Sequence, residues 1–305
     1  MVFLRALWLF PGQGNQFAGM LAHVTSELKE HVEQLLGLKL VDTAEGYHDS
    51  VQLQVSIALV QVDQINQLIA AENKPDLVAG HSLGAFAAAY AAGSIKQDDL
   101  FRVVKHRASL MQNAYPSGYG MGVVAGLTRR QLAPLVAQIN SPASPVFLSN
   151  QNAANQTCIS GKLTAIDQVL QLAKQSGAVI AQRLRVPVPS HSPLMQKVAE
   201  QLEQEIAQIT IAKPHCRYLT NYSGRSVRQA KFVATDLINN LIYPVYFEDM
   251  INVARDYQPE VIVNFVPGTP FTTILHQTFG GLRQINLNQT SVADAIYLLN
   301  KWKKR

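Results

Sequence analysis

A serine stands between two glycines in the pentapeptide GHSLG, residues 80–84. A short apolar run precedes it and an alanine-rich run over residues 83–92 follows it. This pattern between a buried strand and a helix is typical of a nucleophile elbow, and the helix start offers N–H groups to a developing oxyanion. We therefore predict that Ser82 is a nucleophile. The alternative is a glycine-rich packing turn with a capping serine.

A serine hydroxyl needs a base, and His191 is the leading candidate. It lies in the proline-rich segment PVPSHSP, where Ser192 and Pro193 are expected at the N-cap and first position of the next helix. An ordinary loop histidine is the alternative reading. His81 is the rival base, but neighbouring side chains on an elbow point apart.

Three acids lie between the serine and this histidine, namely Asp98, Asp99 and Asp167, and none is well placed for a triad. We therefore expect a Ser–His dyad, with a backbone carbonyl orienting the imidazole.

A charged residue, Arg107, lies on the apolar stripe of the helix that follows Asp98. An inward-facing guanidinium is costly unless an anion meets it, and its planar fork suits a carboxylate. We expect Arg107 to bind a substrate carboxylate. An arginine that snorkels to solvent or pairs with an internal acid is the alternative.

The first apolar run ends in the loop PGQGNQ, residues 11–16. It is not a dinucleotide fingerprint, because Phe17 stands where the third glycine would be. Gln13, between two glycines, could form an oxyanion hole with the backbone N–H of Leu83.

Apolar runs alternate with helical patterns, which predicts an α/β fold with a parallel-sheet core resembling that of α/β-hydrolases. The first helix is expected from about Asn15, and a later one near residues 235–241. The order over residues 119–185 reads βαββαβ, as in ferredoxin-like domains. We expect this segment to be a small inserted domain and residues 1–118 with 186–305 to form the large one.

The 305 residues are 48% apolar and only 15% charged, so a sizeable core is expected and disorder is excluded for most of the chain. Cys158 and Cys216 form no CxxC pair and no HExxH occurs, which argues against a zinc ribbon or zincin. We expect buried thiols in a reducing compartment. Without a recognisable signal peptide, a cytoplasmic protein is expected, and the apolar run 77–95 is interpreted as buried.

The net charge is +5, yet residues 83–190 alone hold ten lysines and arginines against three acids. This excess around the predicted cleft favours an anionic partner, such as a CoA phosphate or an acidic carrier protein. A generic basic surface is the alternative. Nucleic acid fits less well, since no binding motif is present.

Together, FPGQGNQ (10–16), GHSLG (80–84), the Arg107 helix and PSHSPLM (189–195) resemble the malonyl-CoA:acyl-carrier-protein transacylase family. The segments YPVYF (243–247) and VPG (266–268) match more loosely. The resemblance spans nearly the whole chain. It implies a serine acyltransferase that needs neither a metal nor a bound cofactor, with malonyl-CoA and an acyl carrier protein as its partners.

The resemblance also implies roles for individual residues. Ser82 would carry malonyl as an ester, His191 would act as base and acid, and Arg107 would hold the malonyl carboxylate. Gln13 and the Leu83 N–H would form the oxyanion hole. The family's histidine is steadied by the main-chain carbonyl of a glutamine, whose position here is Asn240.

Two segments, GHSLGAFAAAYAAG (80–93) and AYPSGYGM (114–121), look more like the epsilon subunit of malonate decarboxylase. There Ala85 replaces the acid that fatty-acid enzymes usually carry. The resemblance then favours transfer to the phosphoribosyl-dephospho-CoA thiol of the decarboxylase carrier subunit. The alternative is the phosphopantetheine thiol of a carrier in fatty-acid or polyketide synthesis.

Two further classes compete with transfer to a thiol. A serine esterase would release free malonate, and a non-catalytic carrier-docking subunit would form no acyl-enzyme.

Overall fold

A computed structural model describes residues 4–115, 117–268 and 271–304 of the chain. Its larger sheet has the strand order β10-β9-β1-β2-β7-β8, in which all neighbours run parallel except β7 and β8. The predicted parallel core is therefore confirmed. These strands are β1 (Ala6–Phe10), β2 (Leu77–Gly80), β7 (Arg217–Leu219), β8 (Ser226–Val227), β9 (Val261–Asn264) and β10 (Arg283–Asn286).

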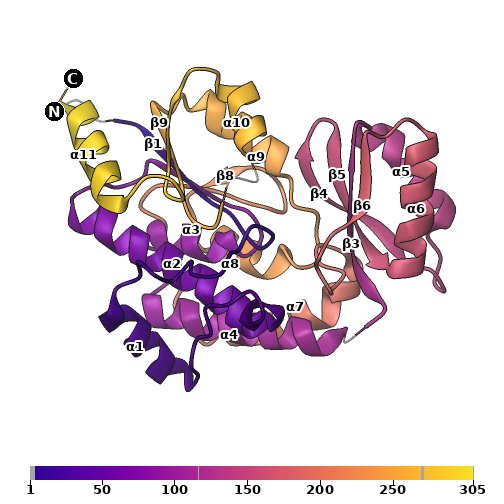
Figure 1. The fold of residues 1–305 in the computed structure, drawn as a ribbon, viewed down its shortest axis with the longest axis horizontal. Coiled ribbons are helices and arrows are strands. Elements are labelled where there is room, and N and C mark those ends of the chain that lie inside the picture. The colour runs from indigo at the N-terminus through magenta and orange to yellow at the C-terminus, as the bar shows by residue number, and fades with distance from the viewer. Residues whose placement is uncertain (1–3, 116, 269–270, 305) are drawn as a thin grey trace.

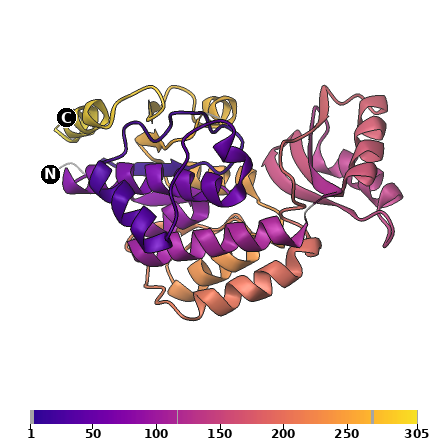
Figure 2. The ribbon, with the colours of Figure 1, turned by 60° about the horizontal axis from the view of Figure 1, so that its bottom comes forward.

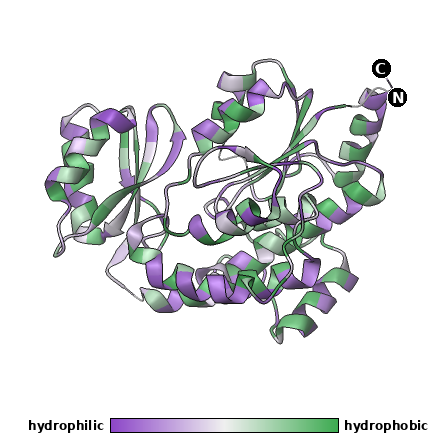
Figure 3. Ribbon diagram, turned by 180° about the vertical axis from the view of Figure 1, so that it is seen from behind, coloured by the Kyte–Doolittle hydropathy of each residue, from purple (hydrophilic) through white to green (hydrophobic). Residues whose placement is uncertain are grey.

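Helices cover both faces of this sheet (Figure 1). Alternation along β1 explains why: Trp8 and Phe10 enter the core on one face, while Leu7 and Leu9 enter the core on the other. Coloured by hydropathy, many helices carry an apolar face and a polar face (Figure 3).

The face of Trp8 is covered by α1 (Ser26–Leu36), α2 (Ser50–Ala70), α3 (Gly84–Ala91), α4 (Gln97–Ala114), α7 (Gln196–Ile206), α8 (Ala230–Asn239) and α11 (Val292–Lys303). The face of Leu7 is covered by α9 (Phe247–Asp256) and α10 (Thr272–Phe279). Short 3-10 turns, η1 (Gly46–His48) and η2 (Pro193–Met195), precede α2 and α7.

The second sheet is antiparallel, with the order β4-β5-β3-β6. The chain runs through β3 (Tyr119–Ala125), α5 (Arg129–Ile139), β4 (Val146–Ala153), β5 (Gln156–Lys162), α6 (Leu163–Gln175) and β6 (Ile180–Arg183). This is the expected βαββαβ order, and both helices pack on the face turned away from the larger sheet (Figures 1 and 2). A separate domain over residues 119–185 stays a prediction.

Strand β4 joins the second sheet to α9 and to the segment just before it. The Gln151 N–H donates to the Val245 carbonyl at 2.8 Å, and its side-chain amide donates to Glu248 at 2.6 Å. The second sheet is thereby anchored beside α9, close to where the chain leaves α8.

Two predicted elements were misplaced. Residues 15–25 form turns rather than a helix, and α1 begins only at Ser26, because Gly19 and several polar residues interrupt the helical pattern there. The helix expected near residues 235–241 is α8, which starts five residues earlier and ends at Asn239. Pro116, in the segment 114–121, lies outside the described residues.

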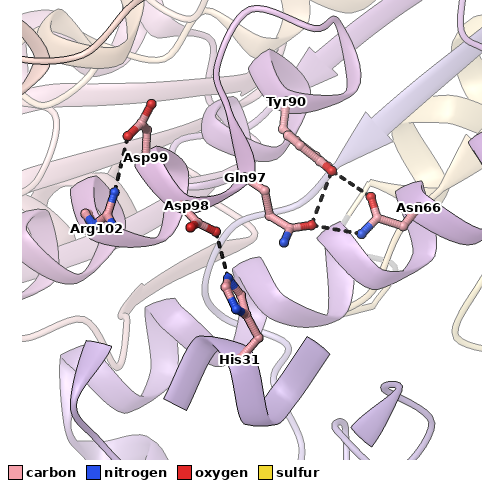
Figure 4. A network of polar contacts seen from close by, with 7 residues as sticks. All are labelled: His31, Asn66, Tyr90, Gln97, Asp98, Asp99 and Arg102. Carbon is pink, nitrogen blue, oxygen red and sulfur yellow. Dashed lines mark hydrogen bonds and ion pairs between the residues drawn. The ribbon is translucent and has the colours of Figure 1, made fainter. Parts of the chain in front are cut away.

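Polar contacts hold the first turn of α4 against its neighbours (Figure 4). The Tyr90 hydroxyl donates to Asn66 at 2.7 Å, and the Asn66 amide donates to Gln97 at 3.0 Å. The next residue, Asp98, contacts His31 of α1 at 2.8 Å. These contacts fix the start of the helix that carries Arg107.

None of the helices within the described ranges combines the length and apolar character needed to cross a membrane. The apolar run 77–95 instead forms β2 and the buried α3.

Candidate active site

Ser82 lies at a sharp turn between β2 and α3. Its φ is +54°, a left-handed conformation that is strained for a residue with a side chain. The flanking glycines make the turn possible: a Cβ added to Gly84 would lie 2.1 Å from the Phe10 carbonyl oxygen, and one on Gly80 would lie 2.2 Å from the Gly84 oxygen. The observed turn is the elbow geometry that the sequence predicts.

Two polar contacts surround the serine. Its N–H donates to Asn221 Oδ1 at 2.8 Å, and Arg107 Nη2 lies 3.5 Å from its hydroxyl oxygen. The N–H of Leu83, next along the chain, donates to no acceptor among the described residues. This leaves the Leu83 N–H available to an oxyanion, whereas that of Ser82 is already used.

Arg107 is almost wholly buried, with 1% of its surface exposed. Its Nη1 donates to Gln54 Oε1, and its guanidinium lies 5.9 Å from the centre of the Phe86 ring. Burial lowers its pKa to about 10, so it is charged at neutral pH. No acid pairs with it within the described part of the chain. An interior cation with only a neutral partner is costly, and a bound anion would offset that cost.

His191 is buried and also adopts a left-handed backbone, with φ of +60°. Its Nδ1 contacts the backbone carbonyl of Asn240. With Nδ1 donating to that carbonyl, Nε2 is left free to accept a proton. Burial, helped by His81 and Arg107, lowers the His191 pKa to about 3, so the imidazole is neutral.

The loop before this histidine is held by its own hydrogen bonds. The Ser192 hydroxyl donates to the Pro189 carbonyl at 2.6 Å, and the Ser190 N–H donates to Val188 at 2.9 Å. Ser192 is the N-cap residue of η2, as expected, but its side chain does not cap the turn. The Asn240 side-chain amide is buried without a hydrogen-bond partner among the described residues, so the polar contact of this residue with His191 is made by its backbone.

The rival base is engaged elsewhere. His81 Nε2 lies 3.2 Å from Asn152 Oδ1 and 3.4 Å from Asn150 Nδ2, both on β4. Its ring meets Phe247 edge-on at 5.5 Å, and burial lowers its pKa to about 4. Through these contacts, His81 joins the elbow to the second sheet.

The loop after β1 lies against the elbow. A Cβ on Gly12 would come within 2.8 Å of the His81 carbonyl oxygen, and the buried Gln61 amide donates to Pro11 at 2.9 Å. Gln13 itself is exposed. The structure thus brings the loop to the turn that carries Ser82, while the oxyanion role of Gln13 stays a prediction.

Four buried polar residues around this site were missed: Gln54, Gln61, Asn221 and Asp236. One signal was available in the sequence, since Gln54 and Gln61 are seven residues apart in one long apolar stretch. Asn221 follows β7, and only the structure shows that β7 lies beside the strand ending at the elbow.

Comparison with known proteins agrees with this geometry. Residues 7–296 match the acyl transferase domain family. The chain is 30% identical to the malonyl CoA-acyl carrier protein transacylase of Haemophilus influenzae, over 94% of this chain and 96% of that protein.

Solved structures are also similar. The malonyl CoA-acyl carrier protein transacylase of Coxiella burnetii aligns with a TM-score of 0.90 at 28% identity, covering 100% of this chain and 99% of that one. A malonyl-transacylase solved in complex with a type II PKS acyl-carrier protein gives 0.90 at 26% identity, over 97% and 99%. These names match the predicted alternative, a carrier of fatty-acid or polyketide synthesis, better than the decarboxylase assignment.

Proposed function

The chain belongs to the acyl transferase domain family, and on that premise we propose that it transfers malonyl from malonyl-CoA to the thiol of an acyl carrier protein. One observation carries the proposal: a buried guanidinium, without an acidic partner among the residues that the structure describes, lies 3.5 Å from the hydroxyl of a serine on a strained elbow. Such a pair suits an acyl group that ends in a carboxylate.

In the first half-reaction, His191 Nε2 takes the proton of Ser82 as its oxygen attacks the thioester carbonyl carbon. The Leu83 N–H and the Gln13 amide stabilise the oxyanion, and Arg107 holds the malonyl carboxylate. The carbon–sulfur bond then breaks. The CoA sulfur leaves with the proton from His191, and malonyl stays on Ser82 as an ester.

In the second half-reaction, the carrier thiol gives its proton to His191 and attacks the ester carbonyl. The carbon–oxygen bond to Ser82 breaks, and the serine oxygen recovers the proton. A histidine that is neutral at working pH can accept a proton in both halves, and burial keeps His191 in its neutral form.

Transfer to a phosphopantetheine-bearing carrier is the first candidate, because the similar proteins named above are malonyl CoA-acyl carrier protein transacylases. The decarboxylase carrier, with its phosphoribosyl-dephospho-CoA thiol, is the second. The observation that favours it is the resemblance of residues 80–93 and 114–121, including the buried Ala85.

Intact mass spectrometry after adding malonyl-CoA tests the core of the proposal. A malonyl adduct is expected on the wild-type chain and is expected to be absent from Ser82→Ala. No adduct on the wild type would refute acyl transfer and support a docking role. Rapid loss of the adduct as free malonate, faster than transfer to any carrier, would favour an esterase.

Incubating the malonylated protein with the two types of carrier in parallel identifies the acceptor. Faster transfer to the phosphopantetheine carrier supports the first candidate, and faster transfer to the dephospho-CoA-type carrier supports the second.

A further inference from the structure

Asp236 on α8 carries a buried carboxylate that is linked to Ser82 through one residue. It hydrogen-bonds to Asn221, which in turn accepts from the Ser82 N–H. It is fully buried and accepts four hydrogen bonds. Its Oδ1 accepts from the N–H groups of Asn221 at 2.6 Å and Tyr222 at 3.2 Å. Its Oδ2 accepts from the Tyr218 hydroxyl at 2.7 Å and the Asn221 side-chain amide at 3.0 Å.

These bonds determine which way the Asn221 amide faces. Because its Nδ2 donates to the carboxylate, its Oδ1 must face the opposite way, where it accepts from the Ser82 N–H at 2.8 Å. A reversed amide would set its NH₂ group, a donor, against the Ser82 N–H, which is also a donor, and would leave the carboxylate short of a donor. The carboxylate thus fixes an acceptor that holds the backbone of a strained residue.

The same residue connects to the base. The Asp236 carbonyl accepts from the Asn240 N–H at 3.0 Å, one helical turn on, and the Asn240 carbonyl contacts His191 Nδ1. Helix α8 packs against α3, which begins just after the elbow, and against α7, which follows His191 (Figure 1). One turn of α8 therefore reaches both members of the dyad.

We propose that Asp236 is a positioning residue that, through the Asn221 amide, sets the backbone of Ser82 relative to His191. This inference rests on the proposed function in treating Ser82 as the nucleophile. Asp236 touches no reacting atom, and its effect is expected on the rate of acylation rather than on binding of malonyl-CoA.

Replacing the carboxylate by an amide tests the proposal. Asp236→Asn presents an NH₂ where two donors already point, so the Asn221 amide loses its fixed orientation. Misplacement of a nucleophile by about 1 Å can cost about 100-fold, so we expect single-turnover acylation by malonyl-CoA to slow by roughly 10- to 100-fold. The KM for malonyl-CoA is expected to stay within about 3-fold, since Arg107 is untouched.

A reciprocal exchange separates positioning from a structural role. In Asn221→Asp with Asp236→Asn, the amide at 236 donates to the carboxylate at 221, whose other oxygen accepts from the Ser82 N–H. The Tyr218 hydroxyl can then accept from that amide and turn toward the Ala85 carbonyl, 3.4 Å away. We expect the double variant to acylate at least about 5-fold faster than Asp236→Asn.

Asp256→Asn makes the same chemical change at an exposed carboxyl of α9 and serves as the matched control. It is expected to acylate at the wild-type rate. Circular dichroism and thermal unfolding report the folded fraction of each variant, to which the rates are normalised. If Asp236→Asn does not fold, Asn221→Ala breaks the same link at the Ser82 end, and the same slowing is expected of it.

A second readout distinguishes failure of this inference from failure of the proposed function. A fluorophosphonate probe reacts with an activated serine without a malonyl group: the Ser82 oxygen bonds to phosphorus, fluoride leaves, and the proton passes to His191. We expect probe labelling to slow in Asp236→Asn and to recover in the double variant. Wild-type acylation rates in a folded Asp236→Asn or Asn221→Ala, or no recovery in the double variant, would overturn the inference.

Discussion

Removing the buried guanidinium is the most direct test of what selects the acyl group. In Arg107→Ala, a malonyl carboxylate arriving beside Ser82 would lose the guanidinium that lies 3.5 Å from the serine hydroxyl, and the partner left behind, Gln54, is neutral. An acetyl group carries no carboxylate and loses nothing by the change.

The size of the effect follows from burial. A hydrogen bond to a charged group contributes about 1.5–3 kcal/mol, and a broken buried ion pair costs about 3–5 kcal/mol. With 1% of Arg107 exposed, solvent offers little compensation. A loss of about 3 kcal/mol corresponds to roughly a 150-fold lower kcat/KM for malonyl-CoA.

The assay measures kcat/KM with malonyl-CoA and with acetyl-CoA on the same protein preparation. We expect the malonyl value to fall as stated, the acetyl value to stay within about 3-fold, and the preference for malonyl to vanish. Arg102→Ala, an exposed arginine on the same helix, is the matched control and should leave both values unchanged. If Arg107→Ala still prefers malonyl over acetyl, the role given to this arginine is wrong.

Three further perturbations test the elbow, the base and the loop. The pKa of His191 is about 3 in the folded protein and 6.5 as its reference, so the unfolded chain gains a proton first as the pH falls. Urea titrations should show that the free energy of unfolding of the wild type falls by about 2 kcal/mol relative to that of His191→Gln between pH 7.5 and 5. A difference that does not change with pH would contradict the buried neutral state. Gly84→Ala places a Cβ 2.1 Å from the Phe10 oxygen, so thermal unfolding should show at least about 2 kcal/mol of destabilisation, and a wild-type melting curve would refute the close packing. Gln61→Leu leaves the carbonyls of Pro11 and Val266 without the amide that now donates to both, at 2.9 Å and 2.8 Å. We expect about 2–4 kcal/mol lower stability, whereas unchanged stability would show that the amide is dispensable.

The sequence motifs predicted those features of the structure that depend on local sequence. The GHSLG turn, the apolar stripe that turns Arg107 inward and the βαββαβ order were all readable, since each reflects a short periodicity or a glycine that permits a tight turn. The first helix was misplaced because residues 15–25 contain polar and glycine positions that only packing resolves.

The buried polar partners could not be predicted in the same way. Asn221 and Asp236 are fifteen residues apart, and Asn221 lies 139 residues from Ser82 along the chain, so no spacing rule connects them. Their pairing depends on β7 lying beside β2 and on α8 packing against α3.

Residue order alone was therefore enough to predict the strand–turn–helix around Ser82, the inward guanidinium and the class of fold, because these follow from backbone sterics and hydrophobic periodicity over a few turns. The tertiary arrangement decided which amide holds Ser82, which carbonyl meets His191, and that Arg107 has no acidic partner within the described residues. Hydrogen bonds and burial form between whichever groups the packed sheet and helices bring together, and that proximity is a property of the assembled fold rather than of any single segment.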